Sequence, residues 1–309
     1  MTAPADGRRR SQATASDRIT VSDAQFRTLG EAVRRSPSIR NTQPWRLRRL
    51  PDGLAILEDP ARGLPGSDRA GRERTISCGA AVLNARVAMR GLGLAPHVEV
   101  CPEPHDDRVV ASVRATAPNP PAREDLDLVR MIPRRHTHQR VYRSHAVAEE
   151  DLLALRESVT AEGARLTVAD SVSRRRLAEL LSELRPSGPG NRPARTAAAA
   201  GAPPAVRAGA DGADTRLARS TILVISTAAD TRHDWIIAGL ALERMLLTAG
   251  VKGLVVTFGE PDLQNSHVRP RVARALRVWG VPQTLMRIGR ALVDPPSTPR
   301  RPLAELIER

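Results

Sequence analysis

Apolar residues along the chain fall into two recurring patterns that predict helices and strands. Helical spacing is seen, for example, at Leu29 and Val33, in a segment that Ser22 can cap and that Pro37 must end. Alternation of apolar and polar residues, and short apolar runs, predict strands. The predicted helices are 22–35, 75–90, 123–132, 148–162, 171–184, 234–249 and 262–278. The predicted strands are 45–50, 54–58, 98–100, 109–113, 165–169, 220–226, 253–258 and 284–288.

Two segments of the chain resemble each other at a constant offset of 160 residues. Residues 78–94 begin Cys-Gly-Ala-Ala and residues 238–254 begin Ala-Gly-Leu-Ala. Each is a helix rich in small residues that ends near a Gly-Leu pair and continues into an extended strand. Neither copy is large enough to make the whole core, so we expect the two to pack face to face. The alternative is that any alanine-rich helix ending in glycine looks the same.

Two stretches lack the apolar residues that a packed core needs. Residues 1–20 are polar and carry arginines without an apolar segment, which predicts a disordered tail and not a signal peptide. Residues 185–216 are mostly small, polar or proline, and cannot bury enough surface to offset the entropy of ordering. We expect a flexible linker there. The chain then divides into the tail, a first half at 21–120 and a second half at 121–305 that contains the linker.

Positive charge dominates the composition. Forty-eight Lys and Arg residues against 34 Asp and Glu give a formal net charge of +14, and Lys252 is the only lysine. Such a preference for arginine, with abundant Ala, Pro and Gly, is typical of a GC-rich genome. The charge alone therefore does not indicate a nucleic-acid partner, whose interface would also cluster cations beside aromatic side chains. The positive field would still attract an anionic cofactor.

Other sequence signals exclude several classes of site. Cys78 and Cys101 have no C-x-x-C spacing and no histidine cluster around them, which predicts reduced thiols and no metal site. No apolar run approaches the ~20 residues of a membrane span. We expect a cytoplasmic protein without a membrane partner. Nucleophile, zinc and phosphate-loop motifs are absent from the sequence, so no catalytic side chain is predicted.

The candidate chemistry lies in two short segments. Residues 36–45 read Ser-Pro-Ser-Ile-Arg-Asn-Thr-Gln-Pro-Trp, and residues 134–142 read Arg-Arg-His-Thr-His-Gln-Arg-Val-Tyr. The first offers amide and hydroxyl hydrogen bonds for a flat heteroaromatic ring. The second offers fixed positive charge for a phosphate. Together they predict a site for a phosphorylated ring cofactor, and flavin mononucleotide (FMN) is the candidate.

These segments resemble the nitroreductase superfamily of FMN flavoproteins. There, a Ser-Pro-Ser-x-x-Asn-x-Gln-Pro-Trp loop of one subunit touches the flavin, and a basic run of the other subunit holds its phosphate. Both lie on one chain here, so the chain is similar to the Acg-type FMN-binding proteins. The resemblance covers roughly residues 23–185 and 217–305. It implies an α+β nitroreductase-like fold whose two homologous halves form an intramolecular pseudo-dimer, giving a monomer or a weak dimer.

The resemblance also implies which residues of the first loop contact the flavin ring. These are Pro37, Ser38 and Asn41, whose amide offers both a donor and an acceptor. The alternative is that the loop only ends a helix and turns the chain. Gly259, after the second alanine-rich helix, would let the backbone approach the ring. Since no second Ser-Pro-Ser loop exists between 150 and 190, we expect one FMN per chain.

The phosphate contacts are implied by the basic run and by the family's closing segment. A hydroxyl and bidentate guanidinium groups suit a phosphate. A solvated basic turn and a basic tail remain the alternatives. The candidates are Arg135 and Thr137 first, then Arg134, His136 and Arg140, and finally Arg300 and Arg301.

The implied function is an FMN-dependent oxidoreductase. NADPH or NADH would reduce the flavin, which would pass electrons to a nitroaromatic, a quinone or a similar small aromatic acceptor. The alternative is a stress-associated protein that sequesters FMN with little or no turnover, and a third possibility is a scaffold that has lost FMN. In the Acg-type family a lid with aromatic residues folds over the flavin. Residues 185–215 contain no Trp or Tyr, so the lid is degenerate and the flavin would be more open.

Overall fold

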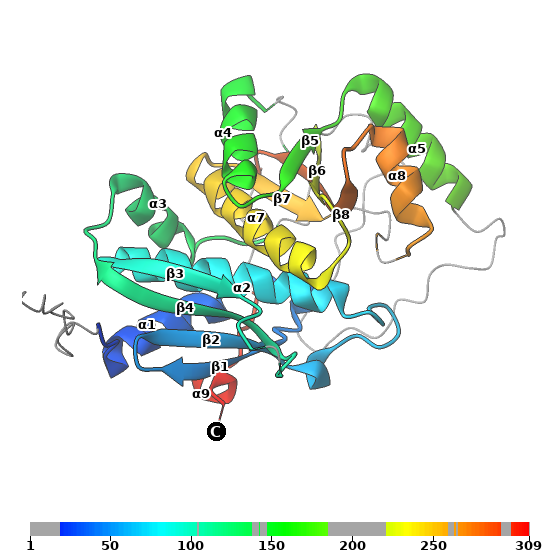
Figure 1. Cartoon of the computed structure of the whole chain (residues 1–309). Helices are drawn as coiled ribbons and strands as arrows, with labels where there is room; N and C mark the ends of the chain where they lie inside the picture. Colours follow the sequence, from blue (N-terminus) through cyan, green and yellow to red (C-terminus); the bar gives the residue numbers. More distant parts are fainter. Residues whose placement is uncertain are drawn as a thin grey trace, which may run out of the picture.

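The computed structural model describes residues 19–103, 105–137, 142, 147–184, 221–258, 263, 265–291 and 298–308. The predicted linker and two candidate site residues, Arg140 and Gly259, lie outside the described residues. Within them, every predicted helix and strand is present, and the fold is α+β with two four-stranded antiparallel sheets (Figure 1). No described helix is both long enough and apolar enough to span a bilayer.

The first sheet is built from the N-terminal part of the chain. A capping box starts the first helix: Ser22 Oγ accepts from Gln25 N at 3.2 Å, and Gln25 Oε1 accepts from Ser22 N at 2.9 Å. The strands pair in the order β1-β2-β4-β3. The elements are α1 (Asp23–Arg34), β1 (Trp45–Leu50), β2 (Gly53–Glu58), α2 (Arg72–Gly91), β3 (Leu94–Val100), β4 (Val109–Pro118) and α3 (Arg123–Met131).

The second sheet has the same strand order as the first. Its strands pair as β5-β6-β8-β7, and one long helix again lies between the second and third strands in the chain. Two further helices, α5 and α8, lie side by side at one end of the molecule (Figure 1). The elements are α4 (Glu149–Thr160), β5 (Arg165–Val168), α5 (Ser171–Leu184), β6 (Thr221–Thr227), α7 (Arg232–Val251), β7 (Val255–Phe258), α8 (Val268–Leu276) and β8 (Val281–Gly289).

The helices α2 and α7 pack against each other between the two sheets (Figure 1). They meet at Gly79 and Gly239, which are 160 residues apart. A Cβ on Gly239 would collide with the carbonyl oxygen of Ile76 and lie 2.8 Å from Cα of Gly79, and a Cβ on Gly79 would collide with the carbonyl oxygen of Ile236. Only glycine allows this approach at either position. The repeat seen in the sequence therefore relates two positions that face each other in the fold.

A second pair of residues at the same spacing ties each long helix to the opposite sheet. Arg72, in the first turn of α2, donates from Nη1 to the backbone oxygen of Gln283 on β8 at 2.7 Å. Arg232, at the start of α7, donates from Nη2 to Oε1 of Glu58 on β2 at 3.2 Å. Arg72 is buried, and burial lowers its pKa. These bonds connect each long helix to the sheet of the other half.

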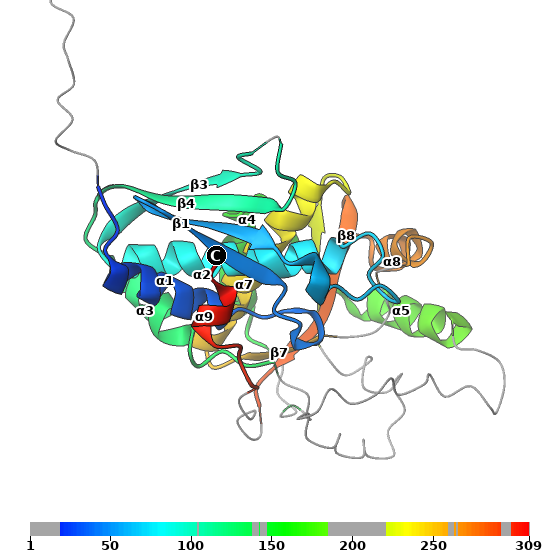
Figure 2. The same ribbon diagram turned by 90° about the horizontal axis from the view of Figure 1, so that it is seen from below.

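The C-terminal segment returns to the first sheet, although the predicted boundary groups it with the second half. Its helix α9 (Leu303–Leu306) contacts α1 and β1 (Figure 2). Ile307 forms a parallel bridge with Leu47, and Glu308 N donates to the oxygen of Leu47 at 2.8 Å. The stretch before α9 is therefore held beside the end of α1, where the Ser-Pro-Ser loop begins.

The glycine contact predicts the effect of adding one methyl group. Gly239→Ala should lower the free energy of unfolding by about 2 kcal/mol, because overpacking against backbone outweighs the better helix propensity of alanine. Gly250→Ala in the same helix is the matched control, since its Cβ would meet only the flexible side chain of Met131. It should stay within about 1 kcal/mol of the parent. Urea denaturation measures both, and equal effects would contradict the role of the crossing.

Candidate functional site

The Ser-Pro-Ser loop leaves α1 through a buried polar anchor. Ser36 is fully buried, and Nδ2 of Asn84 on α2 donates to its Oγ at 2.9 Å and to the backbone oxygen of Ala32 at 3.1 Å. Further along, Ser38 Oγ accepts from the backbone N of Gln43 at 2.9 Å. The buried anchor fixes where the loop starts, and the Ser38 bond closes it into a compact turn.

The turn itself is held in an unusual backbone conformation. Arg40, Asn41 and Gln43 have φ values of 45°, 57° and 49°, three of the five positive φ angles among described non-glycine residues. Such residues cost free energy and persist where the surroundings fix them, often at binding sites. Trp45, which follows, is completely buried in β1, as expected of a packed strand residue.

The predicted basic run after α3 divides into residues of different exposure. Arg134 is exposed, His136 and Thr137 are half-buried, and Arg135 is only 6% exposed. Arg135 Nη2 donates to the backbone oxygen of Arg35 at 3.2 Å, at the end of α1. The structure therefore brings Arg135 to the base of the Ser-Pro-Ser loop, whereas the Arg134 side chain faces solvent.

The C-terminal segment adds a third contribution to the same place. Asn41 Nδ2 donates to the backbone oxygen of Pro299 at 3.0 Å, and Arg300 Nη1 lies 3.4 Å from Asn41 Oδ1. Arg301 serves a different purpose: its backbone N donates to Oε1 of Gln43 at 2.9 Å, and its Nη1 donates to the backbone oxygen of Gln43 at 3.1 Å. Of the predicted pair, Arg300 joins the cationic group and Arg301 fastens the segment to the loop.

Arg35, Arg135 and Arg300 carry like charge and influence one another and His136, and we call these four residues the cationic cluster. Burial, followed by the charges of Arg135 and Arg35, lowers the pKa of Arg300 to about 10. Burial, followed by Arg135, Arg300 and Arg35, lowers the pKa of His136, which favours its neutral form. Burial is the larger cause of both shifts and repulsion between the cations adds to it, and an anion at this position would reduce that repulsion.

One carboxylate faces the cationic cluster from below. Glu243 on α7 is completely buried, and its Oε1 lies 3.5 Å from Nε of Arg135. Burial raises the pKa of Glu243 to about 7, although the charge of Arg135, the side-chain amide of Asn84 and the charge of Arg300 act in the opposite direction. The arrangement is a buried carboxyl group paired with one guanidinium group, that of Arg135, and influenced by the charge of a second, that of Arg300.

The cationic cluster contains buried nitrogen atoms without a hydrogen-bond partner, and such atoms are what an anion would need. Nε of Arg300 and Nδ1 of His136 are buried and have no hydrogen-bond partner among the described residues. Nε of Arg135 also lacks a hydrogen bond and has only the ion pair with Glu243. Guanidinium donors without a hydrogen-bond partner, on fixed positive charge, suit a phosphate group, and a neutral His136 can add one donor from its ring. The residues present therefore fit the phosphate group of a ligand.

Two members of the site did not appear among the residues predicted from sequence. Arg35 lies directly before the Ser-Pro-Ser loop, and nothing in the spacing distinguishes it from the other arginines. Glu243 carried a usable signal, because it is a charged residue in a helix whose neighbours are almost all apolar. A carboxylate on a helix expected to be buried needs a partner, and the sequence does not say which.

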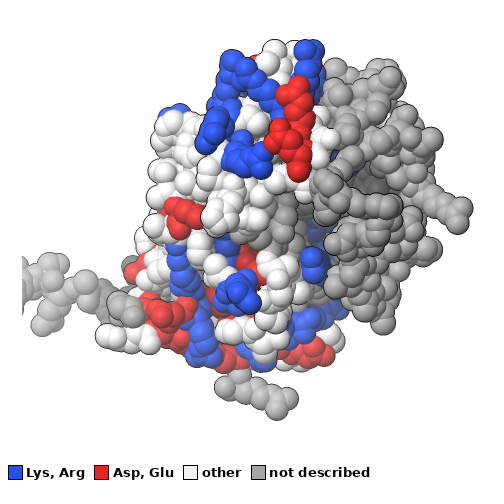
Figure 3. All heavy atoms as spheres, turned by 90° about the vertical axis from the view of Figure 1, so that its right-hand side faces the viewer, with Lys and Arg blue, Asp and Glu red and all other residues white. Residues whose placement is uncertain are grey.

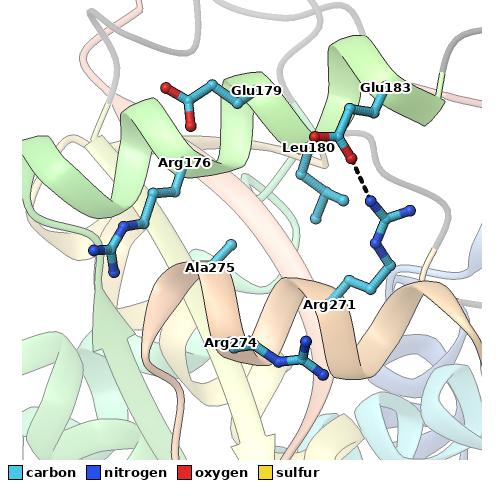
Figure 4. A pocket seen from close by; sticks show the side chains of 7 residues that line it. All are labelled: Arg176, Glu179, Leu180, Glu183, Arg271, Arg274 and Ala275. Atoms are coloured by element: carbon cyan, nitrogen blue, oxygen red, sulfur yellow. Dashed lines mark hydrogen bonds and ion pairs between the residues drawn. The ribbon is translucent and has the colours of Figure 1, made fainter.

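The structure also has a groove far from these residues, between α5 and α8. It has a volume of about 340 Å³, and Glu183 and Arg271 form an ion pair across it (Figure 4). Positive and negative side chains lie next to one another on the face that carries these helices (Figure 3). No predicted site residue lines the groove.

Among the described residues, no group of His, Cys, Asp and Glu is arranged to hold a metal.

Comparison with known proteins assigns the family. No family model matches the chain. A Mycobacterium tuberculosis protein named "Putative NAD(P)H nitroreductase Rv3131" is 31% identical over 346 residues, covering 100% of this chain and 97% of that protein. The chain belongs to the nitroreductase family. A second nitroreductase relative from M. tuberculosis, named "Putative NAD(P)H nitroreductase acg", is 29% identical over 88% of this chain and 92% of its own length.

Solved nitroreductase structures are more distant. One from Desulfovibrio desulfuricans, in complex with FMN, is 18% identical and covers 58% of this chain and 94% of its own, with a TM-score of 0.40. The NADPH:FMN oxidoreductase of Vibrio harveyi, complexed with NAD⁺, is 14% identical and covers 59% of this chain and 76% of its own, with a TM-score of 0.41. These TM-scores are too low to support an inference about this nitroreductase.

The buried carboxyl predicts how stability depends on pH. The pKa of Glu243 is higher in the folded protein than in the unfolded chain, so the folded state binds this proton more tightly. Stability therefore falls as the pH rises from about 4.5 to about 7. Glu243→Gln has no carboxyl group to titrate and should not lose stability in this way. The free energy of unfolding of the variant minus that of the parent should increase by about 2–3 kcal/mol between pH 5 and pH 8. Urea denaturation without flavin measures this, and a pH-independent difference would contradict it.

Proposed function

We propose that this protein is an FMN-dependent oxidoreductase that passes electrons from NAD(P)H to a nitroaromatic, a quinone or a similar small aromatic acceptor. Membership of the nitroreductase family supports the class of reaction. One structural observation supports FMN as the cofactor. The loop after α1, the turn after α3 and the C-terminal segment bring an amide side chain and cationic donors without a described partner to one place. This is the arrangement that the ring and the phosphate of FMN require.

The residues divide between the two ends of the cofactor. Arg135 and Arg300 would hold the phosphate, and Thr137 would add a hydroxyl from the same turn. Pro37, Ser38 and Asn41 would line the ring. His136 would be a neutral hydrogen-bond partner near pH 7, since burial and its cationic neighbours lower its pKa.

Bound FMN would supply the hydride and electron transfer, so the protein needs no nucleophile of its own. The chain's contribution is binding, orientation and charge. The anchored turn at 36–43 fixes the position of Asn41, and the C-terminal segment fixes Arg300 beside it. The names of the relatives support NAD(P)H as the reductant.

We also propose that the two sheets arose by duplication within one chain. The identical strand order and the two residue pairs 160 positions apart support this origin. A single chain would then supply both halves of the pseudo-dimer and act as a monomer or a weak dimer. The second half has no further Ser-Pro-Ser loop between 150 and 190, which supports one FMN per chain.

The deciding experiment is an absorbance spectrum of the purified protein followed by anaerobic titration with NADPH and NADH. Flavin bands near one FMN per chain that bleach rapidly would support the oxidoreductase. Flavin bands that persist would support the sequestering protein instead. Absence of flavin, even after reconstitution with FMN, would overturn both.

The phosphate assignment predicts a specific loss of cofactor. Arg135→Ala combined with Thr137→Ala should abolish FMN retention through gel filtration, because it removes a buried guanidinium and a hydroxyl from the phosphate end. Arg130→Ala is the control, as this exposed arginine of α3 pairs with Asp127 at 3.1 Å and is not among the predicted phosphate contacts. It should retain FMN like the parent. Retention by the double variant would refute the assignment.

A further inference from the structure

We propose that Glu243 is a counter-ion built into the cationic cluster, so that binding of a phosphate by Arg135 and Arg300 is coupled to protonation of this carboxylate. The proposal rests on the proposed function, since it takes the phosphate of FMN as the ligand. It adds that the affinity of the site is set by a residue that the ligand does not touch.

The geometry gives Glu243 one principal partner. Its carboxylate is completely buried, its nearest cation is Nε of Arg135 at 3.5 Å, and neither oxygen has a hydrogen bond of good geometry among the described residues. A buried carboxylate that lacks such bonds stays charged only while nearby cations stabilise it. A ligand that competes for those cations favours the protonated form of Glu243.

The elements packed around Glu243 offer few alternatives. Arg135 follows α3, and Arg300 comes from the C-terminal segment; both favour the charged carboxylate. Arg35 at the end of α1 and His136 act on the same cluster. From α2, the polar side chain that faces Glu243 is the uncharged Asn84. The next residue on its own helix, Arg244, lies near a different carboxylate, that of Glu162.

A phosphate would compete with Glu243 for the same positive charge. A dianion on Arg135 and Arg300 places negative charge close to the carboxylate and reduces the net attraction that keeps it ionised. Glu243 then takes up a proton from solvent, and no covalent bond changes. Because the carboxyl of the free protein titrates at about pH 7, the coupling operates near neutral pH. Phosphate binding should weaken as the pH rises through this range.

Glu162 shows the contrasting arrangement and provides the matched control. It is also buried and lies near α7, yet two guanidinium groups pair with it, from Arg86 and from Arg244, the latter at 3.6 Å. Neither arginine belongs to the cationic cluster. Glu162→Gln therefore removes a buried carboxylate of the same size without changing the charge below the phosphate.

The test measures the FMN dissociation constant by flavin fluorescence at pH 5.5, 7.0 and 8.5 for the parent, Glu243→Gln and Glu162→Gln. The phosphate of FMN titrates near pH 6, and this contribution cancels in the ratio of parent to variant. The dissociation constant of the parent divided by that of Glu243→Gln should be near one at pH 5.5. It should rise to about ten at pH 8.5, as expected for coupling of about one pKa unit. For Glu162→Gln it should not change with pH.

Two further measurements separate the possible outcomes. Riboflavin lacks the phosphate, so the ratio of its dissociation constants for the parent and Glu243→Gln should not change with pH. A pH-dependent ratio with riboflavin would overturn the counter-ion role. Calorimetry of the parent in buffers of different ionisation enthalpy should show uptake of a fraction of a proton on FMN binding at pH 7.5. This second readout applies even if Glu243→Gln does not fold.

The failures are distinguishable. FMN binding with a flat ratio and no proton uptake would overturn the counter-ion role and leave the proposed function intact. Failure of the folded parent to bind FMN at every pH would overturn both.

Discussion

The close contact between Gly79 of α2 and Gly239 of α7 sets the distance between the two sheets, and the rest of the structure depends on that distance. Each glycine faces backbone of the other helix, so a side chain at either position would push the helices apart. With the helices this close, Arg72 and Arg232 each reach the opposite sheet. The same closeness places Glu243 of α7 near the turn after α3 and Asn84 of α2.

The candidate site follows from this packing and from the path of the C-terminal segment. Its parts come from the end of α1, the turn after α3 and the residues before α9, which are far apart in the chain. No single element positions the cationic cluster. Buried bonds of Asn84 and Gln43 anchor the loop at one side and the C-terminal segment at the other. The cluster is costly in isolation because its cations repel, so an anion that bound there would stabilise the folded protein.

Secondary structure was predictable because local signals agree with the final fold. The capping box at Ser22, the glycine after α2 and the alternating strands act over a few residues and do not need tertiary contacts. The paired motifs were also sufficient to suggest the family, because residues 36–45 and 134–142 resemble its flavin-binding loop and its basic run. The roles of Arg300 and Arg301 could not be separated in the same way. Adjacent residues point in different directions, and only the position of Gln43 decides which one fastens the segment.

The sequence by itself determined the order of helices and strands, the offset of 160 residues between the two small-residue helices, and the segments that carry the candidate chemistry. Tertiary structure alone decided that Gly79 meets Gly239, that the C-terminal segment returns to the first sheet, and that Arg35 joins the cationic cluster with Glu243 beside it. The physical reason is range. Hydrophobic periodicity and capping are local, whereas burial and electrostatic pairing depend on which distant side chains share a low-dielectric space.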